Sequence, residues 1–442
     1  MFYLLLLSLV LRLVFLNQSL WLDESIEALA LMGKMGPLLQ YALADYQPPL
    51  YHLIGYLSTQ LFGYSEIALR LPSLLSGIFT VYFVVRIGQT IGNQKIGYLA
   101  GILAATNPLL IYYSQEGRTY AMTTFFVTAS FYYFVKLLKD KSSKSSMFFY
   151  FLFTTCFIWT SYLSWFLLLG FGIYSLYKKR YDLFALQVIS TLTLMAWVPS
   201  FISSLRIGQS TMTHSPEWGK VVGGLNWKSI PLTWTKFNIG RIGFDNKYLY
   251  AFIVGVISLV HLGILKKIPW GKYREVLIWL LVPVILGIVF ATLLPVYSYF
   301  RVLFVLPAYL ILLAVGLVTI GNKHLIKITV LIQLIALSYF WATPRYHRED
   351  WRSLSQEIET GTTLAMPSRA QSAPLVYYGY TDKIIEPSHE PLSGSRIYYI
   401  KYVEDLFDVK KLGQENLLKS GYTIKEQKVY SGIQLDIYEN RN

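Results

Sequence analysis

Two adjacent acids follow the first apolar stretch of the chain, in the segment "SLWLDESIEALAL" that begins at Ser19. Asp23 and Glu24 lie in a helix-like pattern, and an acid at a helix start accepts backbone N–H bonds and favours the helix dipole. N-capping is therefore one explanation of this pair. A carboxylate within reach of an attacking hydroxyl can also take its proton. The second explanation is a catalytic base at a membrane surface.

Three more polar clusters interrupt apolar sequence, in "ADYQPPLY", "YYSQEGRTYAM" and "PVYSYFRVLFVLP". Ionisable groups near membrane depth are costly and usually have a function. The plain alternatives are a turn pair for Glu116 and Arg118, and snorkelling for Arg301. The candidate residues are Asp45, Gln47, Tyr113, Glu116, Arg118, Tyr120, Tyr297, Tyr299 and Arg301, and "SEIALRLPS" adds Glu66 and Arg70.

The elements that carry these clusters are predicted to be membrane helices. The chain has 442 residues, of which 54% are hydrophobic and 14% charged, and its mean hydropathy is +0.43. Apolar runs near the length that spans a bilayer recur along it, which predicts a mainly α-helical, polytopic membrane protein with about eleven spans. These segments are residues 1–16, 71–91, 96–113, 119–138, 147–162, 163–177, 183–204, 248–265, 276–294, 302–320 and 325–342.

The distribution of charge predicts the orientation of these spans. Residues 1–342 carry 26 Lys and Arg against 11 Asp and Glu, a balance of +15, whereas residues 343–442 carry 13 against 14. With the N-terminus in the cytoplasm, 15 of those 26 basic residues fall in five short cytoplasmic loops, as the positive-inside rule requires. Eight of the 11 acids then lie outside. The charge therefore reflects topology, and nucleic-acid binding is not predicted.

Two long loops and the tail are predicted to lie on the outer face. The first loop, residues 17–70, contains two short amphipathic segments, 21–35 and 48–63, which we expect to be interfacial helices. The second loop, residues 205–247, contains Trp218, Trp227 and Trp234. An aromatic belt at the interface explains these tryptophans without any substrate contact.

The tail, residues 343–442, has the pattern of a small α/β domain. Segments 362–368, 373–380, 396–403, 422–432 and 433–440 are predicted strands, and 350–361 and 405–421 are predicted helices. It contains no Gly-rich phosphate loop and no cluster of metal ligands, so we assign it no chemistry. The chain has a single cysteine, Cys156, and so no intrachain disulfide.

Three stretches together resemble the GT-C superfamily of membrane glycosyltransferases: "LDES", "DYQPPLYHLIGYLSTQLFGYSEIALRLPSLLSG" and "NPLLIYYSQEGRTYAM". The resemblance is to bacterial relatives of protein O-mannosyltransferases and of lipid A aminoarabinose transferases, and it extends over residues 20–125. "REDWRSLSQEI" resembles the start of the outer tail in many bacterial members. The resemblance implies a GT-C domain over residues 1–342 followed by an extracytoplasmic domain over residues 343–442.

The resemblance also implies a reaction: transfer of a hexosyl or pentosyl group from a polyprenyl-phosphate donor to a hydroxyl of a glycan, lipid or protein. This would occur on the outer face of a bacterial-type inner membrane. Asp23, with Glu24 beside it, matches the catalytic acid of the family. Donor or phosphate contacts are expected from Arg118, Arg301, Glu116, Tyr120 and Tyr299, and other pocket positions are Asp45, Gln47, Arg70 and Tyr113.

One position departs from the family pattern, because many relatives have His or Lys where this chain has Gln47. A divalent metal, Mg²⁺ or Mn²⁺, is an open question, with Asp23 and Glu116 as candidate oxygen ligands. Two alternative functions also stay open. A transporter or flippase would place polar groups inside a multispan protein, usually near its midplane, and a non-catalytic protein that binds polyprenyl lipid would have much the same sequence.

Overall fold

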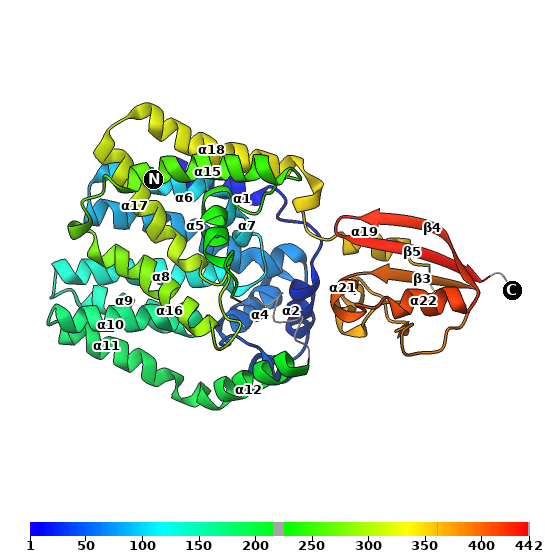
Figure 1. Ribbon diagram of the computed structural model, residues 1–442. Helices are drawn as coiled ribbons and strands as arrows, with labels where there is room; N and C mark the ends of the chain where they lie inside the picture. Colours follow the sequence, from blue (N-terminus) through cyan, green and yellow to red (C-terminus); the bar gives the residue numbers. More distant parts are fainter. Residues whose placement is uncertain (215–224, 360, 441–442) are drawn as a thin grey trace. The chain divides into compact units, whose positions relative to one another are not determined.

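The computed structural model describes residues 1–214, 225–359 and 361–440, which form two compact units. The first unit comprises Met1–Leu16, Met35–Gly63 and Ala68–Ala342, and the second comprises Asn17–Lys34, Tyr64–Ile67 and Thr343–Asn442. Figure 1 shows helices throughout the first unit and a sheet in the second. Glu217 and Trp218, in the predicted second outer loop, lie outside the described residues.

The first unit is helical from end to end. Figure 1 shows α8, α9, α10 and α11 running side by side. Its helices are α1 (Phe2–Leu13), α3 (Met35–Ala44), α4 (Leu50–Phe62), α5 (Glu66–Ile91), α6 (Gln94–Thr106), α7 (Pro108–Ser114), α8 (Thr119–Lys139), α9 (Lys144–Ile158), α10 (Trp165–Tyr177), α11 (Tyr181–Leu192), α12 (Val198–His214), α14 (Ser229–Ile239), α15 (Lys247–Leu265), α16 (Arg274–Ala291), α17 (Leu306–Ile320) and α18 (Lys323–Ala342).

Seven helices in the described part of the chain are long and apolar enough to cross a membrane, and one bent pair makes an eighth. Three shorter apolar helices, Phe2–Leu13, Lys144–Ile158 and Tyr162–Tyr177, bring the total to eleven, so that a helix lies on every predicted apolar segment. The prediction of a mainly α-helical polytopic protein is confirmed. The number of helices that cross stays a prediction, because the 12 residues of α1 cover only about 18 Å of a core about 30 Å thick.

The bent pair, α6 and α7, meets at 60° because of Pro108. Proline has no N–H, so the carbonyl of Ala104 loses its helical partner at the bend. The Arg12 side chain donates to the carbonyls of Ala104 (3.4 Å) and Ala105 (3.2 Å), and its Nε donates to Ser114 Oγ at 3.1 Å. Backbone groups inside a membrane must be satisfied within the protein. Arg12 therefore allows the chain to bend where it does.

Asn107 completes the bend from the other side. Its Oδ1 accepts hydrogen bonds from the backbone N–H groups of Leu109 and Leu110, at 3.0 and 3.1 Å. These are the donors that the first turn of α7 would otherwise leave unpaired. Its Nδ2 donates to the carbonyl of Phe237 at 2.9 Å, which joins α7 to α14. The bend thus sets the course of α7 and of the turn that follows it, Gln115–Arg118.

The predicted interfacial segments of the first outer loop are helical. Helix α2 (Leu22–Met32) lies within residues 21–35, and α4 lies within residues 48–63. The structure adds α3 between them, so the loop has three helices where two are predicted. The sequence "MGPLLQYALA" has enough apolar residues for a helix. Its pattern is less clearly amphipathic than that of its neighbours, which is why the sequence does not predict it.

The tail contains a five-stranded mixed sheet, in the order β2-β1-β3-β5-β4. The pairs β1–β2 and β1–β3 are parallel, and β3–β5 and β4–β5 are antiparallel. Its strands are β1 (Thr363–Ala365), β2 (Ile384–Ile385), β3 (Arg396–Lys401), β4 (Tyr422–Tyr430) and β5 (Ile433–Asn440), and its helices are α19 (Trp351–Glu357), α20 (Ala373–Tyr377), α21 (Glu404–Phe407) and α22 (Leu412–Lys419). The predicted α/β domain is confirmed.

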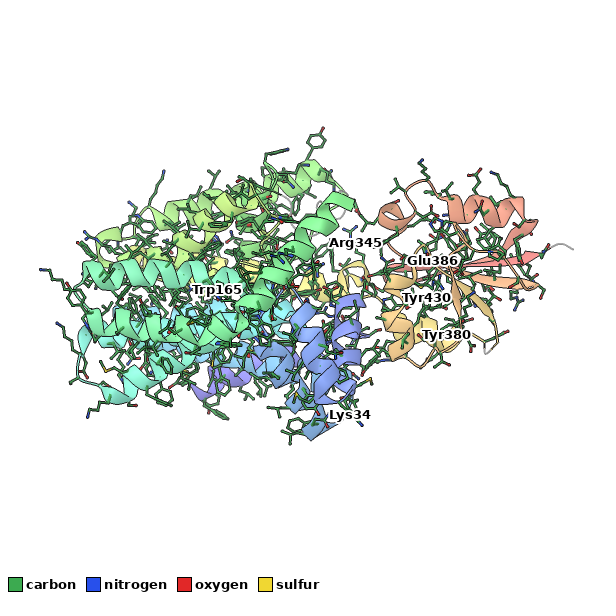
Figure 2. All side chains as sticks on the ribbon, turned by 90° about the horizontal axis from the view of Figure 1, so that it is seen from below. Lys34, Trp165, Arg345, Tyr380, Glu386 and Tyr430 are labelled. Atoms are coloured by element: carbon green, nitrogen blue, oxygen red, sulfur yellow. The ribbon has the colours of Figure 1, made fainter. Side chains whose placement is uncertain are left out.

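Both faces of this sheet are covered. Tyr398 and Ile400 of β3 point into one apolar cluster, and Ile397 and Tyr399 point into the other, as alternation along a strand requires. Tyr380 and Tyr430, labelled in Figure 2, are partly buried and pack against the first cluster.

One predicted element of the tail is wrong. The apolar and tyrosine residues of segment 373–380 predict a strand, but Ala373–Tyr377 forms helix α20. Pro374 occupies the first turn of this helix, where its fixed φ and missing N–H are tolerated. A proline also cannot donate to a sheet ladder. The short strand β2 has no signal in the sequence.

We expect Arg12→Met to destabilise the protein. The substitution removes every donor that Arg12 offers to the buried carbonyls at the α6–α7 bend, and each buried group left unsatisfied costs about 1–3 kcal/mol. The free energy of unfolding in detergent should fall by about 2 kcal/mol or more. Lys95→Met, at an exposed position on α6, is the matched control. Equal stability of the two variants would show that Arg12 does not hold the bend.

Candidate active site

The first unit has a small recess that is partly open to solvent. Four separate parts of the chain line it: the turn before α4, the first turns of α8, the connection between α9 and α10, and the approach to α17. The lining residues are Gln47, Thr119, Tyr120, Thr123, Ser161, Leu163, Phe300, Arg301, Leu303 and Phe304. Three of them, Gln47, Tyr120 and Arg301, are site residues that the sequence predicts.

Arg301 supplies a cation to the wall of this recess. Its Nη1 donates to the carbonyl of Pro295 at 2.7 Å, which holds the side chain across the turn before α17. The side chain is half-buried. A guanidinium presents five N–H donors in a fixed fork that suits phosphate oxygens. Arg301 is therefore placed to bind an anionic group that enters the recess.

An aromatic group borders Arg301. Tyr120 and Phe300 lie 5.3 Å apart between ring centroids, and Tyr113 lies 5.2 Å from Tyr120 and 6.3 Å from Phe300. Tyr299 packs edge-on against Phe300, with centroids 5.4 Å apart. The predicted tyrosines Tyr113, Tyr120 and Tyr299 are thus brought together. Ring faces such as these are suited to the apolar faces of a sugar or a prenyl chain.

Gln47 has a covered side-chain oxygen at the wall of the recess. Its Oε1 is covered, and it has no hydrogen-bond partner in the part of the chain that the structure describes. A covered carbonyl oxygen without a partner costs free energy. Since Gln47 lines the recess, a hydroxyl or amide of a bound molecule would satisfy this acceptor.

Asp45 pairs with His52. Asp45 Oδ2 lies 3.1 Å from His52 Nε2, and the hydroxyl of Ser204 donates to the Asp45 carbonyl at 2.9 Å. Burial acts first on Asp45 and raises its pKa. The hydrogen bond from His52 and the positive charge of Arg118 outweigh burial, so the pKa of Asp45 lies below its ordinary 3.8. Asp45 is therefore an anion at neutral pH.

Arg118 lies close enough to Asp45 for their charges to interact. It precedes α8, and its carbonyl accepts a hydrogen bond from Ser73 Oγ at 3.3 Å. Glu116 is fully buried in the same turn and interacts electrostatically with Tyr113 and Arg241. The structure thus gathers Asp45, Glu116 and Arg118 around the turn between α7 and α8.

Arg70, another predicted pocket residue, contacts the backbone that follows α1. It is fully buried, and its Nη1 donates to the carbonyl of Leu16 at 2.7 Å. Gln115 similarly donates to the carbonyls of Arg12, at 2.9 Å, and of Val14. Arg70 does not line the recess. It fastens the residues that leave α1, where four carbonyls lack helical partners.

Asp23 and Glu24 belong to the second unit, in the first turn of α2. The N-cap residue of this helix is Trp21, without a side-chain hydrogen bond, and the two acids lie in the first turn, where a carboxylate favours the helix dipole. Glu24 is fully buried and lies 3.6 Å from Arg348 Nη1. Asp23 is only half-buried. The two carboxylates therefore differ in environment, although the sequence does not distinguish them.

Three residues at these sites are missed by the sequence analysis. His52 follows the Pro-Pro pair on a segment predicted to be interfacial, and a histidine there is a usable signal. Arg241 lies in the second predicted outer loop, with its guanidinium 4.4 Å from the ring centroid of Tyr112. Arg348 lies in the tail, to which the sequence assigns no chemistry. Arg241 and Arg348 give no signal, because their partners are more than 100 residues away.

No three His, Cys, Asp or Glu side chains among the described residues lie close enough together to hold a metal ion. Asp23 and Glu116, the predicted oxygen ligands, belong to different units. We assign no step to a metal, and the question of a divalent metal stays open for experiment.

A comparison with known protein families also matches this part of the chain. Residues 46–203 match the family described as dolichyl-phosphate-mannose-protein mannosyltransferase. No curated protein matches the chain by sequence.

Solved structures extend the likeness to nearly the whole chain. It resembles ArnT from Cupriavidus metallidurans in the apo state, with 12% identity, a TM-score of 0.57, and 98% of this chain and 97% of that chain covered. ArnT bound to undecaprenyl phosphate gives 12% identity, a TM-score of 0.55 and coverages of 98% and 96%. AglB, an oligosaccharyltransferase from Archaeoglobus fulgidus, in complex with an inhibitory peptide and a dolichol-phosphate, gives 11% identity, a TM-score of 0.50 and coverages of 98% and 74%.

A test of the Asp45 environment follows from its pKa. A carboxylate whose pKa is lower in the folded than in the unfolded state stabilises the fold above its unfolded pKa, and this contribution disappears as the pH falls through the folded pKa. We therefore expect the melting temperature of the wild type to fall more than that of Asp45→Asn between about pH 5 and about pH 3. Asp245→Asn, at an exposed position, should behave as the wild type. Parallel curves for wild type and Asp45→Asn would contradict the assignment.

The fold, the recess and the comparisons agree with the motifs in the sequence. At these identities the likeness concerns the fold rather than the substrate. The chain has the GT-C fold of polytopic membrane glycosyltransferases.

Proposed function

We propose that the protein transfers a sugar from a polyprenyl-phosphate donor to an acceptor hydroxyl on the outer face of the membrane. The observation that carries the proposal is the recess of the first unit, where Arg301, Gln47 and the rings of Tyr120 and Phe300 converge from three separate segments. The GT-C fold supports it, since ArnT has been solved with undecaprenyl phosphate and AglB with dolichol-phosphate. The outer location rests on the positive-inside pattern of the loops.

Arg301 binds the phosphate of the donor in this proposal, and Arg118 is the second contact. The leaving group is a lipid phosphate, which is already a stable anion and needs no proton. A fixed guanidinium stabilises the negative charge that grows on the phosphate as the bond breaks. Tyr120 and Phe300 line the recess and form a wall for the sugar and the first prenyl units, and Tyr113 and Tyr299 pack against these two rings.

Asp23 is the general base in this proposal. The acceptor oxygen forms a bond to the anomeric carbon, and the bond from that carbon to the phosphate oxygen breaks with its electron pair. The hydroxyl proton passes to the Asp23 carboxylate. A single attack from the face opposite the phosphate inverts the anomeric configuration. Asp23 is the better candidate of the two acids, because Glu24 is fully buried and paired with Arg348.

The proposed donor carries a hexosyl or pentosyl group, and the proposed acceptor is a glycan, a lipid or a protein. A transporter would carry its polar groups near the membrane midplane, and no observation on the described residues favours it over the transferase. A divalent metal would act at Asp23 or Glu116. Loss of transfer on chelation, restored by Mg²⁺ or Mn²⁺, would establish that it does.

We expect Asp23→Asn to lower turnover by about 100-fold or more, since general-base catalysis contributes about 10²–10⁴. The amide is nearly isosteric, so melting temperature and donor binding should be unchanged. Transfer is measured with purified protein in nanodiscs, a panel of radiolabelled undecaprenyl-phosphate sugars and a membrane extract as acceptor. Asp405→Asn, exposed in the tail, is the control. Near-normal transfer by Asp23→Asn would remove Asp23 from this role.

We expect Arg301→Gln to weaken donor binding and to slow the chemical step, because the guanidinium contacts the phosphate in both states. The KM for the donor should rise and kcat should fall by about 10-fold or more, while Arg301→Lys keeps part of the activity. Arg274→Gln, at an exposed arginine on α16, should leave both constants unchanged. Unchanged constants for Arg301→Gln would place the phosphate elsewhere.

A further inference from the structure

We propose that Arg348 of the tail is a positioning residue for catalysis, which fixes the turn of α2 that carries Asp23. The inference rests on the proposed function, since it concerns the residue proposed there as the base. It gives the tail a part in the reaction, although the tail has no chemistry of its own. All the contacts that carry it lie within the second unit.

The first contact is a buried ion pair. Arg348 Nη1 lies 3.6 Å from Glu24 Oε2, and the exposed fractions of the two side chains are 4% and 0%. A buried charge that loses its partner is strongly destabilised. The pair therefore fixes Glu24 firmly, and Glu24 is the direct neighbour of Asp23.

Because Asp23 and Glu24 are in the same helical turn, fixing the Glu24 side chain also limits the direction in which Asp23 can point. Successive residues of an α-helix point about 100° apart around its axis. Asp23 and Glu24 therefore leave α2 in different directions, and Asp23, which is half-buried, lies close enough to Glu349 and Tyr402 for their charges to interact. A rotation of α2 that moved Asp23 would also pull Glu24 away from its cation.

The residues before α2 are held by the tail as well. The N–H of Arg348 donates to Gln18 Oε1, and the N–H of Arg352 donates to Ser19 Oγ, both at 3.1 Å. The N–H of Leu20 donates to the hydroxyl of Tyr378 at 2.9 Å. Helix α2 has no side-chain cap, so these bonds take the place of one in fixing where it begins.

The same tail residues hold the far end of the first outer loop. The hydroxyl of Tyr378 donates to Glu66 Oε1 at 3.0 Å, and Arg352 Nη2 lies 2.5 Å from the same oxygen. The side chain of Leu22, in the first turn of α2, packs against the apolar core of the tail. The tail thus binds residues 18–24 and Glu66 together. We name Arg348, Arg352 and Tyr378 the tail clamp.

The experiment compares Arg348→Gln and Arg348→Lys with Arg369→Gln in the full-length protein. Arg369 is the matched control, because it also pairs with carboxylates, Glu386 and Glu390, but its side chain is 47% exposed. We expect Arg348→Gln to lower kcat about 10-fold or more without changing the KM for the donor or the affinity for undecaprenyl phosphate. Arg348→Lys should recover part of kcat, and Arg369→Gln should match the wild type.

A double variant separates positioning from a general loss of stability. If Arg348 acts through Asp23, then Arg348→Gln combined with Asp23→Asn should be no slower than Asp23→Asn alone, since residues that act as a unit are not additive. Losses that multiply would overturn the proposal, and so would an unchanged kcat in Arg348→Gln. Should Arg348→Gln fail to fold, Tyr378→Phe carries the test. It removes the acceptor of the Leu20 N–H and should also lower kcat at constant donor affinity.

A measurement that does not depend on catalysis tests this proposal separately from the proposed function. Hydrogen–deuterium exchange of residues 17–32 should be faster in Arg348→Gln than in the wild type, and unchanged in Arg369→Gln. Unchanged exchange in Arg348→Gln would disprove the clamp, whether or not transfer is observed. Absence of transfer by the wild type with every donor would instead disprove the proposed function, and the exchange result would still decide whether the clamp exists.

Discussion

A helix that bends inside a membrane must find partners for the carbonyls that the bend exposes, and in this chain Arg12 supplies them. Pro108 removes one helical donor, and Arg12 donates to Ala104, Ala105 and Ser114 in return. The 60° bend then sets the direction of α7 and of the turn that holds Glu116 and Arg118. These bonds help to fix the turn around which the polar cluster forms.

Each of the two units has a buried or half-buried carboxylate that is held by a nearby partner. Asp45 faces His52 and the charge of Arg118, and Glu24 faces Arg348. These carboxylates are held by nearby cations, which suits positioning groups. Arg301 is oriented by a backbone carbonyl at the wall of the recess. A guanidinium oriented in this way suits the geometry of phosphate oxygens.

The sequence identifies candidate site residues best where charged or polar side chains lie next to predicted membrane helices, because membranes disfavour such residues. Acids, arginines and tyrosines at the predicted outer turns identify Asp45, Glu116, Arg118 and Arg301 as candidates, and the apolar runs identify every long helix. Local patterns also predict strands β1, β3, β4 and β5 of the tail. The recess itself, which draws on four separate segments, could not be predicted, because spacing along a chain does not specify packing between helices.

The errors have physical causes. Segment 373–380 has the composition of a strand, but Pro374 fits the first turn of a helix. The role of the tail is missed because Arg348 meets Glu24 across more than 300 residues, and long-range ion pairs leave no local trace. The sequence does not distinguish the adjacent acids Asp23 and Glu24. The structure does, because Glu24 is buried and paired with Arg348, whereas Asp23 is half-buried.

The central claim is that the recess beside Arg301 receives the phosphate of a polyprenyl donor. A cryo-electron microscopy structure of the full-length protein in nanodiscs with undecaprenyl phosphate tests it most directly. The account predicts density for the phosphate within hydrogen-bond distance of the Arg301 guanidinium, with the first prenyl units against Tyr120 and Phe300. Phosphate density at another place on the protein, with the recess filled by side chains or by water alone, would contradict it.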